Sequence, residues 1–126
     1  MPILAYMINE IEKYRALGDL TRFRIARILL KAGKELCVCE IEDILKIHQY
    51  NASKHLNLLK RSGLVEERKE GRLRMYKIKD NNKFNQYLIK SIISLESQSD
   101  NGLKNDFMNL KKRLTLRKDN KVVVTR

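Results

Sequence analysis

The chain has few of the residues that secreted, membrane-spanning or fibrous proteins depend on. Its 126 residues include no tryptophan, one proline and two cysteines. Two cysteines are too few for the disulfide framework of a small secreted domain. No apolar run approaches the roughly 18 residues of a membrane helix, and the N-terminus lacks the pattern of a secretion signal. We therefore expect a globular cytoplasmic protein with no membrane contact, in which the thiols stay reduced.

Acidic residues are scarce in only two segments, and these carry the net charge of +12. Residues 46–80 hold ten basic and four acidic groups, and residues 111–126 hold seven and one, whereas the rest of the chain is balanced. Basic surfaces on a neutral scaffold favour nucleic acid as partner, because phosphate contacts release counterions. A merely solvated basic surface is the alternative.

Apolar spacing predicts six helices and one hairpin, at about residues 3–16, 20–32, 36–45, 49–62, 64–78 (the hairpin), 83–95 and 103–114. The three-residue turn at 46–48 makes the third and fourth helices a helix-turn-helix, and the basic hairpin that follows is typical of a wing. The fold class is thus mainly α with a small β-hairpin (α+β), a dimeric winged helix-turn-helix. We expect a DNA-binding and dimerisation domain at 1–96, then a linker near 97–102, and a C-terminal helix and mobile basic tail within 97–126.

The fourth helix turns polar side chains away from its apolar stripe. Gln and Asn can pair with adenine edges, Lys can bind guanine or phosphate, and arginines of the hairpin can enter the minor groove. The predicted DNA-contacting residues are Gln49, Tyr50, Asn51, Ser53, Lys54, His55, Asn57, Arg61, Arg72 and Arg74. An ordinary solvated face is the alternative, and His55 could instead serve in packing.

The fifth helix is apolar on two sides. Phe84, Leu88 and Ile92 form one stripe, with Ile89 and Ile93 beside it. Because so small a domain cannot cover both sides, we expect this helix and the first to pack against a second copy. A homodimer would present two recognition helices to double-stranded DNA with a roughly palindromic operator.

Residues 16–80 resemble the ArsR/SmtB family of dimeric winged-helix repressors. The matching sequence motifs are ALGDLTR at 16–22, ELCVCEI at 35–41, SKHL at 53–56, KRSGLV at 60–65 and EGR at 70–72. The resemblance implies a repressor, not an enzyme, that leaves its operator when an inducer binds. The Cys-Val-Cys word is similar to the site of the arsenic- and cadmium-responsive branches, which implies metal-ligand roles for Cys37 and Cys39.

Two departures from the family pattern bear on the inducer. Glu42 stands where the arsenic branch often has a third cysteine, and no cysteine precedes Cys37 as in the cadmium branch. Both histidines, His48 and His55, lie in the DNA-reading region. Two thiolates alone suit tetrahedral Zn²⁺ or Cd²⁺ poorly. We therefore expect no constitutive cofactor and arsenite or antimonite, or another thiophilic metal ion, as inducer. A redox-sensing repressor and a winged-helix regulator without a metal response are the alternatives.

Helical geometry suggests how the thiols could act. At about 100° per residue, Cys37 and Cys39 would lie roughly 200° apart on an intact helix. We therefore expect that chelation must unwind the start of the third helix and so disturb the recognition helix. A disulfide between the two sulfurs would be strained for the same reason, so oxidation is expected to link different chains.

Overall fold

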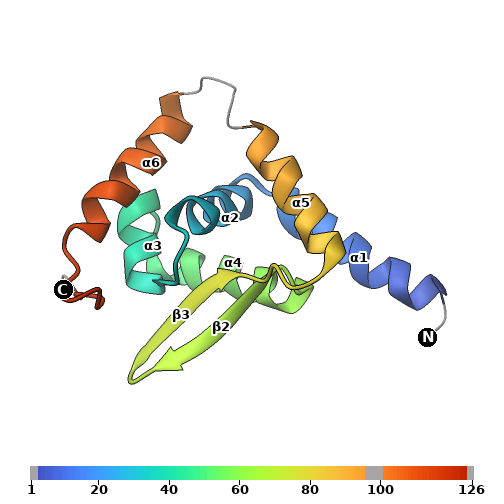
Figure 1. Ribbon diagram of the computed structural model, residues 1–126, viewed down its shortest axis with the longest axis horizontal. Coiled ribbons are helices and arrows are strands. Elements are labelled where there is room, and N and C mark those ends of the chain that lie inside the picture. Colours follow the sequence, from blue (N-terminus) through green and yellow to red (C-terminus); the bar gives the residue numbers. More distant parts are fainter. Residues whose placement is uncertain (1–2, 96–100, 125–126) are drawn as a thin grey trace.

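The helices and the small sheet of this chain follow the predicted order, as the computed structural model in Figure 1 shows for residues 3–95 and 101–124. The elements are α1 (Ile3–Leu17), α2 (Leu20–Ala32), β1 (Leu36–Cys37), α3 (Val38–Leu45), α4 (Gln49–Ser62), β2 (Val65–Glu70), β3 (Leu73–Ile78), α5 (Lys83–Ser94) and α6 (Asn101–Leu114). The winged helix-turn-helix prediction is confirmed. Among these residues, no helix is long and apolar enough to cross a membrane.

The core lies between α2, α3 and α4. The apolar stripes of these helices meet there, and six of their large apolar side chains are fully buried: Ile25, Ile28, Ile41, Ile44, Leu56 and Leu59. Burial of each stabilises the fold by about 1.5–3 kcal/mol. The orientation of α4 is therefore set by its buried stripe, which leaves its opposite face exposed.

The turn between α3 and α4 spans only residues 46–48. Lys46 ends α3 in the left-handed conformation, with φ at 58°. His48 caps α4, because its Nδ1 accepts a hydrogen bond from the backbone N of Tyr50 at 3.2 Å. Gly63 ends α4 at φ 87°, a conformation that a side chain would strain. These ends fix both the start and the length of the recognition helix.

The sheet has three strands in the order β1-β3-β2 rather than the two of the predicted hairpin. Leu36 pairs with Tyr76 and Cys37 with Met75. The prediction of a helix starting at Leu36 is wrong, because the backbone at Leu36 and Cys37 hydrogen-bonds to β3 instead and α3 begins at Val38. Cys37 has extended angles, φ −89° and ψ 165°, and occupies the N-cap position.

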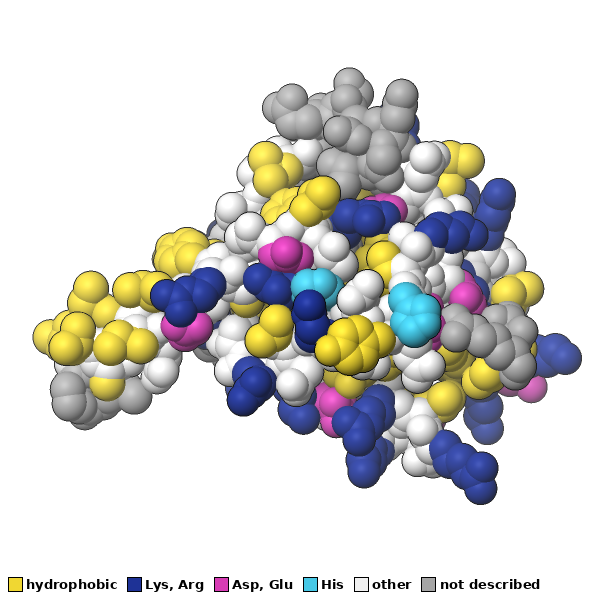
Figure 2. Space-filling view, turned by 180° about the vertical axis from the view of Figure 1, so that it is seen from behind, with side chains coloured by type: hydrophobic (Ala, Val, Ile, Leu, Met, Phe, Trp, Pro, Cys, Tyr) yellow, Lys and Arg dark blue, Asp and Glu magenta, His cyan; other side chains and the backbone are white. Residues whose placement is uncertain are grey.

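The end of α1 meets the start of α5 at one end of the molecule (Figure 1). The ring of Tyr14 meets that of Phe84 edge-on, with centroids 5.4 Å apart. Beyond this contact, α1 exposes the large apolar side chains Ile3, Leu4, Met7, Ile8 and Ile11. In Figure 2 they form the hydrophobic arm at the left. This is the surface expected to pack against a second copy.

Helix α6 packs along α2 and α3. Leu110 is part of the core, and Asp106 accepts two hydrogen bonds from Arg24 at 2.8 and 2.9 Å. The predicted linker falls largely outside the described residues, at 97–100. The prediction of a mobile tail is wrong for residues 116–124, because Arg117 forms a buried ion pair with α3 there.

Candidate nucleic-acid interface and thiol site

The exposed face of α4 carries most of the residues predicted to contact DNA. The helix begins directly after the short turn, and its first three residues are all exposed. The predicted residues that are exposed on α4 are Gln49, Tyr50, Asn51, Ser53, Lys54, Asn57 and Arg61. They form one continuous polar surface that a major groove could accept.

The wing presents Arg72 and Arg74, both exposed near its glycine turn. Arg74 lies 3.7 Å from Glu67, which also accepts a hydrogen bond from the Tyr76 hydroxyl at 2.8 Å. That hydrogen bond lowers the pKa of Glu67, while burial and Glu67 raise the pKa of Tyr76 to about 12. Glu67 is therefore a fixed anion that holds Arg74 beside the groove described next.

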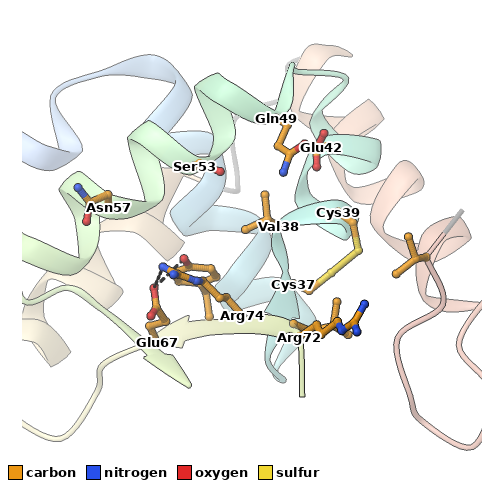
Figure 3. A pocket seen from close by; sticks show the side chains of 13 residues that line it. Cys37, Val38, Cys39, Glu42, Gln49, Ser53, Asn57, Glu67, Arg72 and Arg74 are labelled. Atoms are coloured by element: carbon orange, nitrogen blue, oxygen red, sulfur yellow. Dashed lines mark hydrogen bonds and ion pairs between the residues drawn. A yellow bond between two sulfur atoms is a disulfide. The ribbon is translucent and has the colours of Figure 1, made fainter. Parts of the chain in front are cut away.

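A groove of about 690 Å³ runs between α4 and the wing (Figure 3). Such a gap suits a phosphodiester backbone, because a recognition helix and a wing bind neighbouring grooves of the duplex. The groove is lined by the helix residues Gln49, Ser53 and Asn57, by the wing residues Arg72 and Arg74, and by Cys37 and Cys39 at its inner end. The thiols and the predicted DNA contacts thus share one cavity.

His55 is the exception among the predicted DNA residues. Its side chain is only 12% exposed, and its Nδ1 lies 3.2 Å from Arg22 Nη1 and 3.9 Å from Asp19 Oδ2. Burial is the largest cause that lowers the pKa of His55. A neutral ring with an unprotonated Nδ1 can accept the hydrogen bond from Arg22. The geometry gives His55 a packing role that braces the start of α2 against α4.

The two sulfurs of Cys37 and Cys39 meet, and the structure joins them in a disulfide. The expectation that they diverge across a helix is wrong, because Cys37 precedes α3 and its extended backbone turns its side chain toward Cys39 in the first helical turn. The Cα atoms are 5.5 Å apart. The reduced pair could therefore bridge one ion without any unwinding of α3, and oxidation does not require a second chain.

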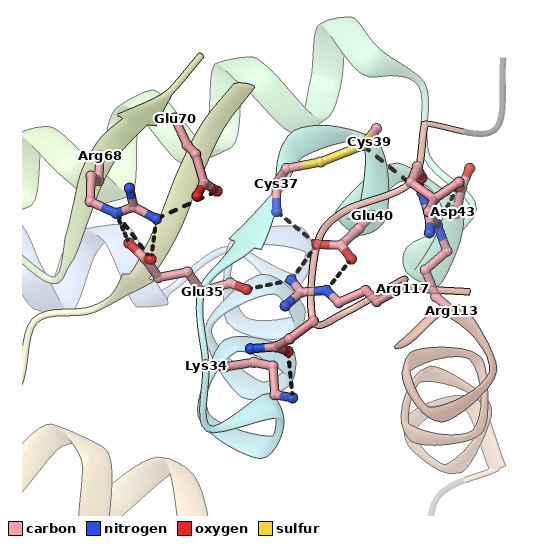
Figure 4. A network of polar contacts seen from close by, with 12 residues as sticks. Lys34, Glu35, Cys37, Cys39, Glu40, Asp43, Arg68, Glu70, Arg113 and Arg117 are labelled. Carbon is pink, nitrogen blue, oxygen red and sulfur yellow. Dashed lines mark hydrogen bonds and ion pairs between the residues drawn. A yellow bond between two sulfur atoms is a disulfide. The ribbon is translucent and has the colours of Figure 1, made fainter. Parts of the chain in front are cut away.

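A polar network that the sequence did not reveal surrounds the thiol pair (Figure 4). Glu40 Oε1 accepts a hydrogen bond from the backbone N of Cys37 at 3.0 Å and pairs with Arg117, while Arg113 pairs with Asp43 and approaches Cys39. Arg113 and Arg117 come from the end of α6 and the tail, 70 and 77 residues from their partners Asp43 and Glu40 in sequence. No local pattern connects such distant partners.

The donor set limits which ions fit. Within residues 3–95 and 101–124, no group of three or more His, Cys, Asp or Glu side chains is arranged to hold a metal ion. Two sulfurs alone leave a tetrahedral ion half coordinated. They fit a three-coordinate, thiophilic centre that takes one further ligand from solution, since soft thiolates select soft acceptors.

Comparisons with known proteins agree with this geometry. Residues 19–67 match the model described as bacterial regulatory protein, arsR family. An HTH-type transcriptional regulator of Methanocaldococcus jannaschii is 43% identical over 84 residues, which are 67% of this chain and 86% of the relative. A cadmium resistance regulatory protein homologue of Staphylococcus aureus is 45% identical over 67 residues, or 53% of this chain and 54% of the relative. The arsenical resistance operon repressor of Escherichia coli is 40% identical over 68 residues, or 54% of this chain and 57% of the relative. The chain therefore matches only about half the length of these last two.

Among solved structures, HlyU from Vibrio cholerae is similar to this chain with a TM-score of 0.62 and 26% identity. The similarity covers 74% of this chain and 97% of that one. A possible transcriptional regulatory protein of Mycobacterium bovis gives a TM-score of 0.61 at the same identity. The fold and the regulatory relatives both support DNA binding through the exposed face of α4.

Proposed function

This chain belongs to the arsR family of regulatory proteins, and we propose that it is a repressor that leaves its operator when arsenite or antimonite bridges Cys37 and Cys39. It is a DNA-binding transcriptional regulator and not an enzyme. The observation that carries the proposal is the position of the thiol pair in the groove between α4 and the wing. The names of the cadmium and arsenical relatives support a thiophilic inducer.

The DNA-bound state is a homodimer. Packing of α1 and α5 against their copies would cover the exposed apolar side chains of α1. A two-fold axis then places two α4 helices about one helical turn apart, so the operator is roughly palindromic. The proposed major-groove contacts are made by Gln49, Tyr50, Asn51, Ser53, Lys54, Asn57 and Arg61, and Arg72 and Arg74 contact DNA from the wing. His55 packs between α2 and α4, where its Nδ1 lies 3.2 Å from Arg22.

The inducer chemistry is a ligand exchange. The reduced thiols of Cys37 and Cys39 displace two hydroxyl groups of arsenous acid and release two molecules of water. The last hydroxyl remains as third ligand, or the thiol of a small molecule displaces it with release of a third water. This exchange requires reduced cysteines, so the proposal includes a cytoplasmic location.

One backbone pairing and one side-chain ion pair link the region of the thiol pair to the wing. Cys37 pairs with Met75 in β3, next to Arg74, and Arg68 of β2 binds Glu35 just before β1 with a shortest distance of 2.8 Å. Any shift of the Cys37 backbone is therefore passed to the wing, and an inducer in the groove occupies space next to Gln49 and Ser53. Both effects favour the DNA-free state, which is the differential affinity that release requires.

The test is fluorescence anisotropy of the reduced protein on DNA from upstream of its own gene, titrated with arsenite. The wild type should dissociate, whereas the Cys37→Ser/Cys39→Ser double variant should bind DNA equally well and stay bound. Arsenate, which does not bind thiols directly, is the ligand control. Release of the double variant by arsenite would refute the assigned roles of the cysteines.

Redox sensing is the second candidate, and the contact between the two sulfurs favours it. Formation of the disulfide removes two electrons and two protons from the thiols, which an oxidant such as a small disulfide takes up. The same titration separates the candidates. An oxidant that releases DNA when arsenite does not would assign the pair to redox control.

A further inference from the structure

The tail that follows α6 is attached to the start of α3 by a buried ion pair. Arg117 donates from Nε to Glu40 Oε2 and from Nη2 to Glu40 Oε1, both at 2.8 Å (Figure 4). The Glu40 side chain is fully buried and that of Arg117 is 7% exposed. Arg117 Nη2 also donates to the carbonyl oxygen of Glu35 at 2.7 Å. The guanidinium therefore connects Glu35, which precedes Leu36 and Cys37, to Glu40, which follows them.

The carboxylate that Arg117 holds is the same one that orients Cys37. Glu40 Oε1 accepts from the backbone N of Cys37 at 3.0 Å, and this bond fixes the extended backbone from which the Cys37 sulfur reaches Cys39. Hydrogen bonds to ionised groups are shorter and stronger than neutral ones. The bidentate grip of Arg117 thus restrains the geometry of the thiol pair through Glu40.

A second arginine supports the other cysteine. Arg113 is 4% exposed, donates from Nε to Asp43 at 2.8 Å, and places Nη2 4.0 Å from Cys39 Sγ. Its Nη2 also donates to the carbonyl oxygen of Val123, which folds the tail back over this end of α3. Val124 then lines the groove together with both cysteines. The end of α6 and the tail thus contact the thiol site through Arg113 and Arg117, and Val124 forms part of its wall.

Stability alone does not explain this arrangement. The desolvation of a buried ion pair offsets much of its attraction, so an apolar pair of similar volume is often equally stable. The pair instead specifies one conformation, because the planar guanidinium accepts few geometries. The conformation that it specifies is the one that brings the two sulfurs together.

We propose that the end of α6 and the tail, residues 113–124, are a clamp that positions the thiol pair, with Arg117 and Arg113 as positioning residues, so that the affinity of Cys37 and Cys39 for a bridging ligand depends on this docked segment. The inference rests on the proposed function of the pair. It concerns residues outside the helix-turn-helix and the wing.

The test compares Arg117→Met with Lys118→Met, which removes the same charge from an exposed neighbour. Arsenite binding to the reduced full-length protein, without DNA, is followed by ultraviolet absorbance. Loss of the charged hydrogen bonds should weaken binding by about tenfold in Arg117→Met and leave Lys118→Met unchanged. Arg117→Lys, which keeps the charge but not the bidentate grip, should lie between them.

A second readout does not involve arsenite. In a glutathione buffer, the protein dithiol and oxidised glutathione exchange to the Cys37–Cys39 disulfide and two reduced glutathiones. The equilibrium constant reports how closely the sulfurs are held, and it should fall by a similar factor in Arg117→Met. If the wild type binds no arsenite, the proposed inducer is wrong, yet this exchange still tests the clamp.

The Glu40→Gln/Arg117→Met double variant is the control for correct folding. The amide oxygen that replaces the Glu40 carboxylate can still accept from the backbone N of Cys37, and no buried charge is left unpaired, so circular dichroism and melting temperature should match the wild type. Weaker thiol binding in this folded variant supports the clamp. Wild-type arsenite affinity and wild-type glutathione equilibrium in the same variant would overturn it.

Discussion

Replacement of Ile11 by Ala should separate the dimer without unfolding the monomer. Ile11 lies near the middle of α1 and is 47% exposed in the single chain, on the same stripe as Leu4 and Met7. The proposed dimer buries this stripe. Loss of the side chain therefore affects the association of two chains more than the folding of one.

The magnitude follows from the area that remains to be buried. The substitution removes three carbon atoms, worth about 2.4 kcal/mol in full burial at about 0.8 kcal/mol per group. Only about half of the side chain is still exposed, which leaves about 1.2 kcal/mol per chain. The two-fold axis repeats the loss, so the dimer is weakened by about 2.4 kcal/mol, or about 50-fold in dissociation constant.

Sedimentation equilibrium measures this constant directly. Asn9→Ala is the matched control, because Asn9 is exposed on the opposite face of the same helix. It should dimerise like the wild type. Operator binding by Ile11→Ala should become dependent on protein concentration in the range where the control is not. An unchanged dissociation constant in Ile11→Ala would refute the assignment of the α1 stripe to the dimer interface.

Three further substitutions test the DNA surface and the role of His55. Arg72→Ala should weaken binding to all sequences alike and reduce the slope of log affinity against log salt by about one per wing, measured by anisotropy across a salt series. Asn57→Ala should lose about 1–3 kcal/mol of discrimination at one base pair, seen as relaxed preference in a panel of single-base operator variants and absent if Asn57 faces only phosphate. For His55, burial lowers the pKa in the folded state, so the unfolded state binds the proton more readily and the free energy of unfolding falls as pH drops below the unfolded pKa of about 6.5. His55→Gln, whose oxygen can still accept from Arg22, should show a flatter decline between pH 7 and 5 in urea unfolding, and an equal decline would contradict the assignment.

The helices were predictable because their signals are local. The apolar stripe of α4, the glycine at residue 63 and the three-residue turn before Gln49 all lie within one stretch of sequence, and the structure keeps the predicted bounds of α4 unchanged. Burial of Ile41, Ile44 and Leu56 follows from the same spacing. The polar face of α4 was predictable for the same reason, since a helix that buries one stripe must expose the other.

The start of α3 could not be predicted in this way. Leu36 and Cys37 have the apolar character of a helix start, but their backbone groups pair with Tyr76 and Met75. Such pairing depends on the position of β3, which sequence spacing around Cys37 does not contain. The error of two residues moves Cys37 from a helix face to an extended strand, and with it the side chain that meets Cys39.

The docked tail was missed for a related reason. A run of basic residues with one aspartate is usually solvated, and composition favours that interpretation for residues 111–126. The acceptors, buried Glu40 and partly exposed Asp43, lie on α3, where their sequence neighbours give no sign of a partner in the tail. Which of these charged residues form ion pairs depends on the fold, which brings residues that are distant in sequence together.

The position of the thiol pair also bears on how the inducer could supply the free energy needed to release DNA. To move an operator from 99% to 1% occupied, the inducer must favour the free state by about 5.5 kcal/mol. Two protomers share this, so each thiol site has to supply about 2.7 kcal/mol. A hydrogen bond to a charged group, such as that from an arginine to a phosphate, contributes about 1.5–3 kcal/mol. Loss of the proposed contacts of Arg72 and Arg74 on each wing would therefore be sufficient, and Cys37 is connected to that wing through its strand pairing with β3. The proposed release thus requires neither the unwinding of α3 nor a movement of α4.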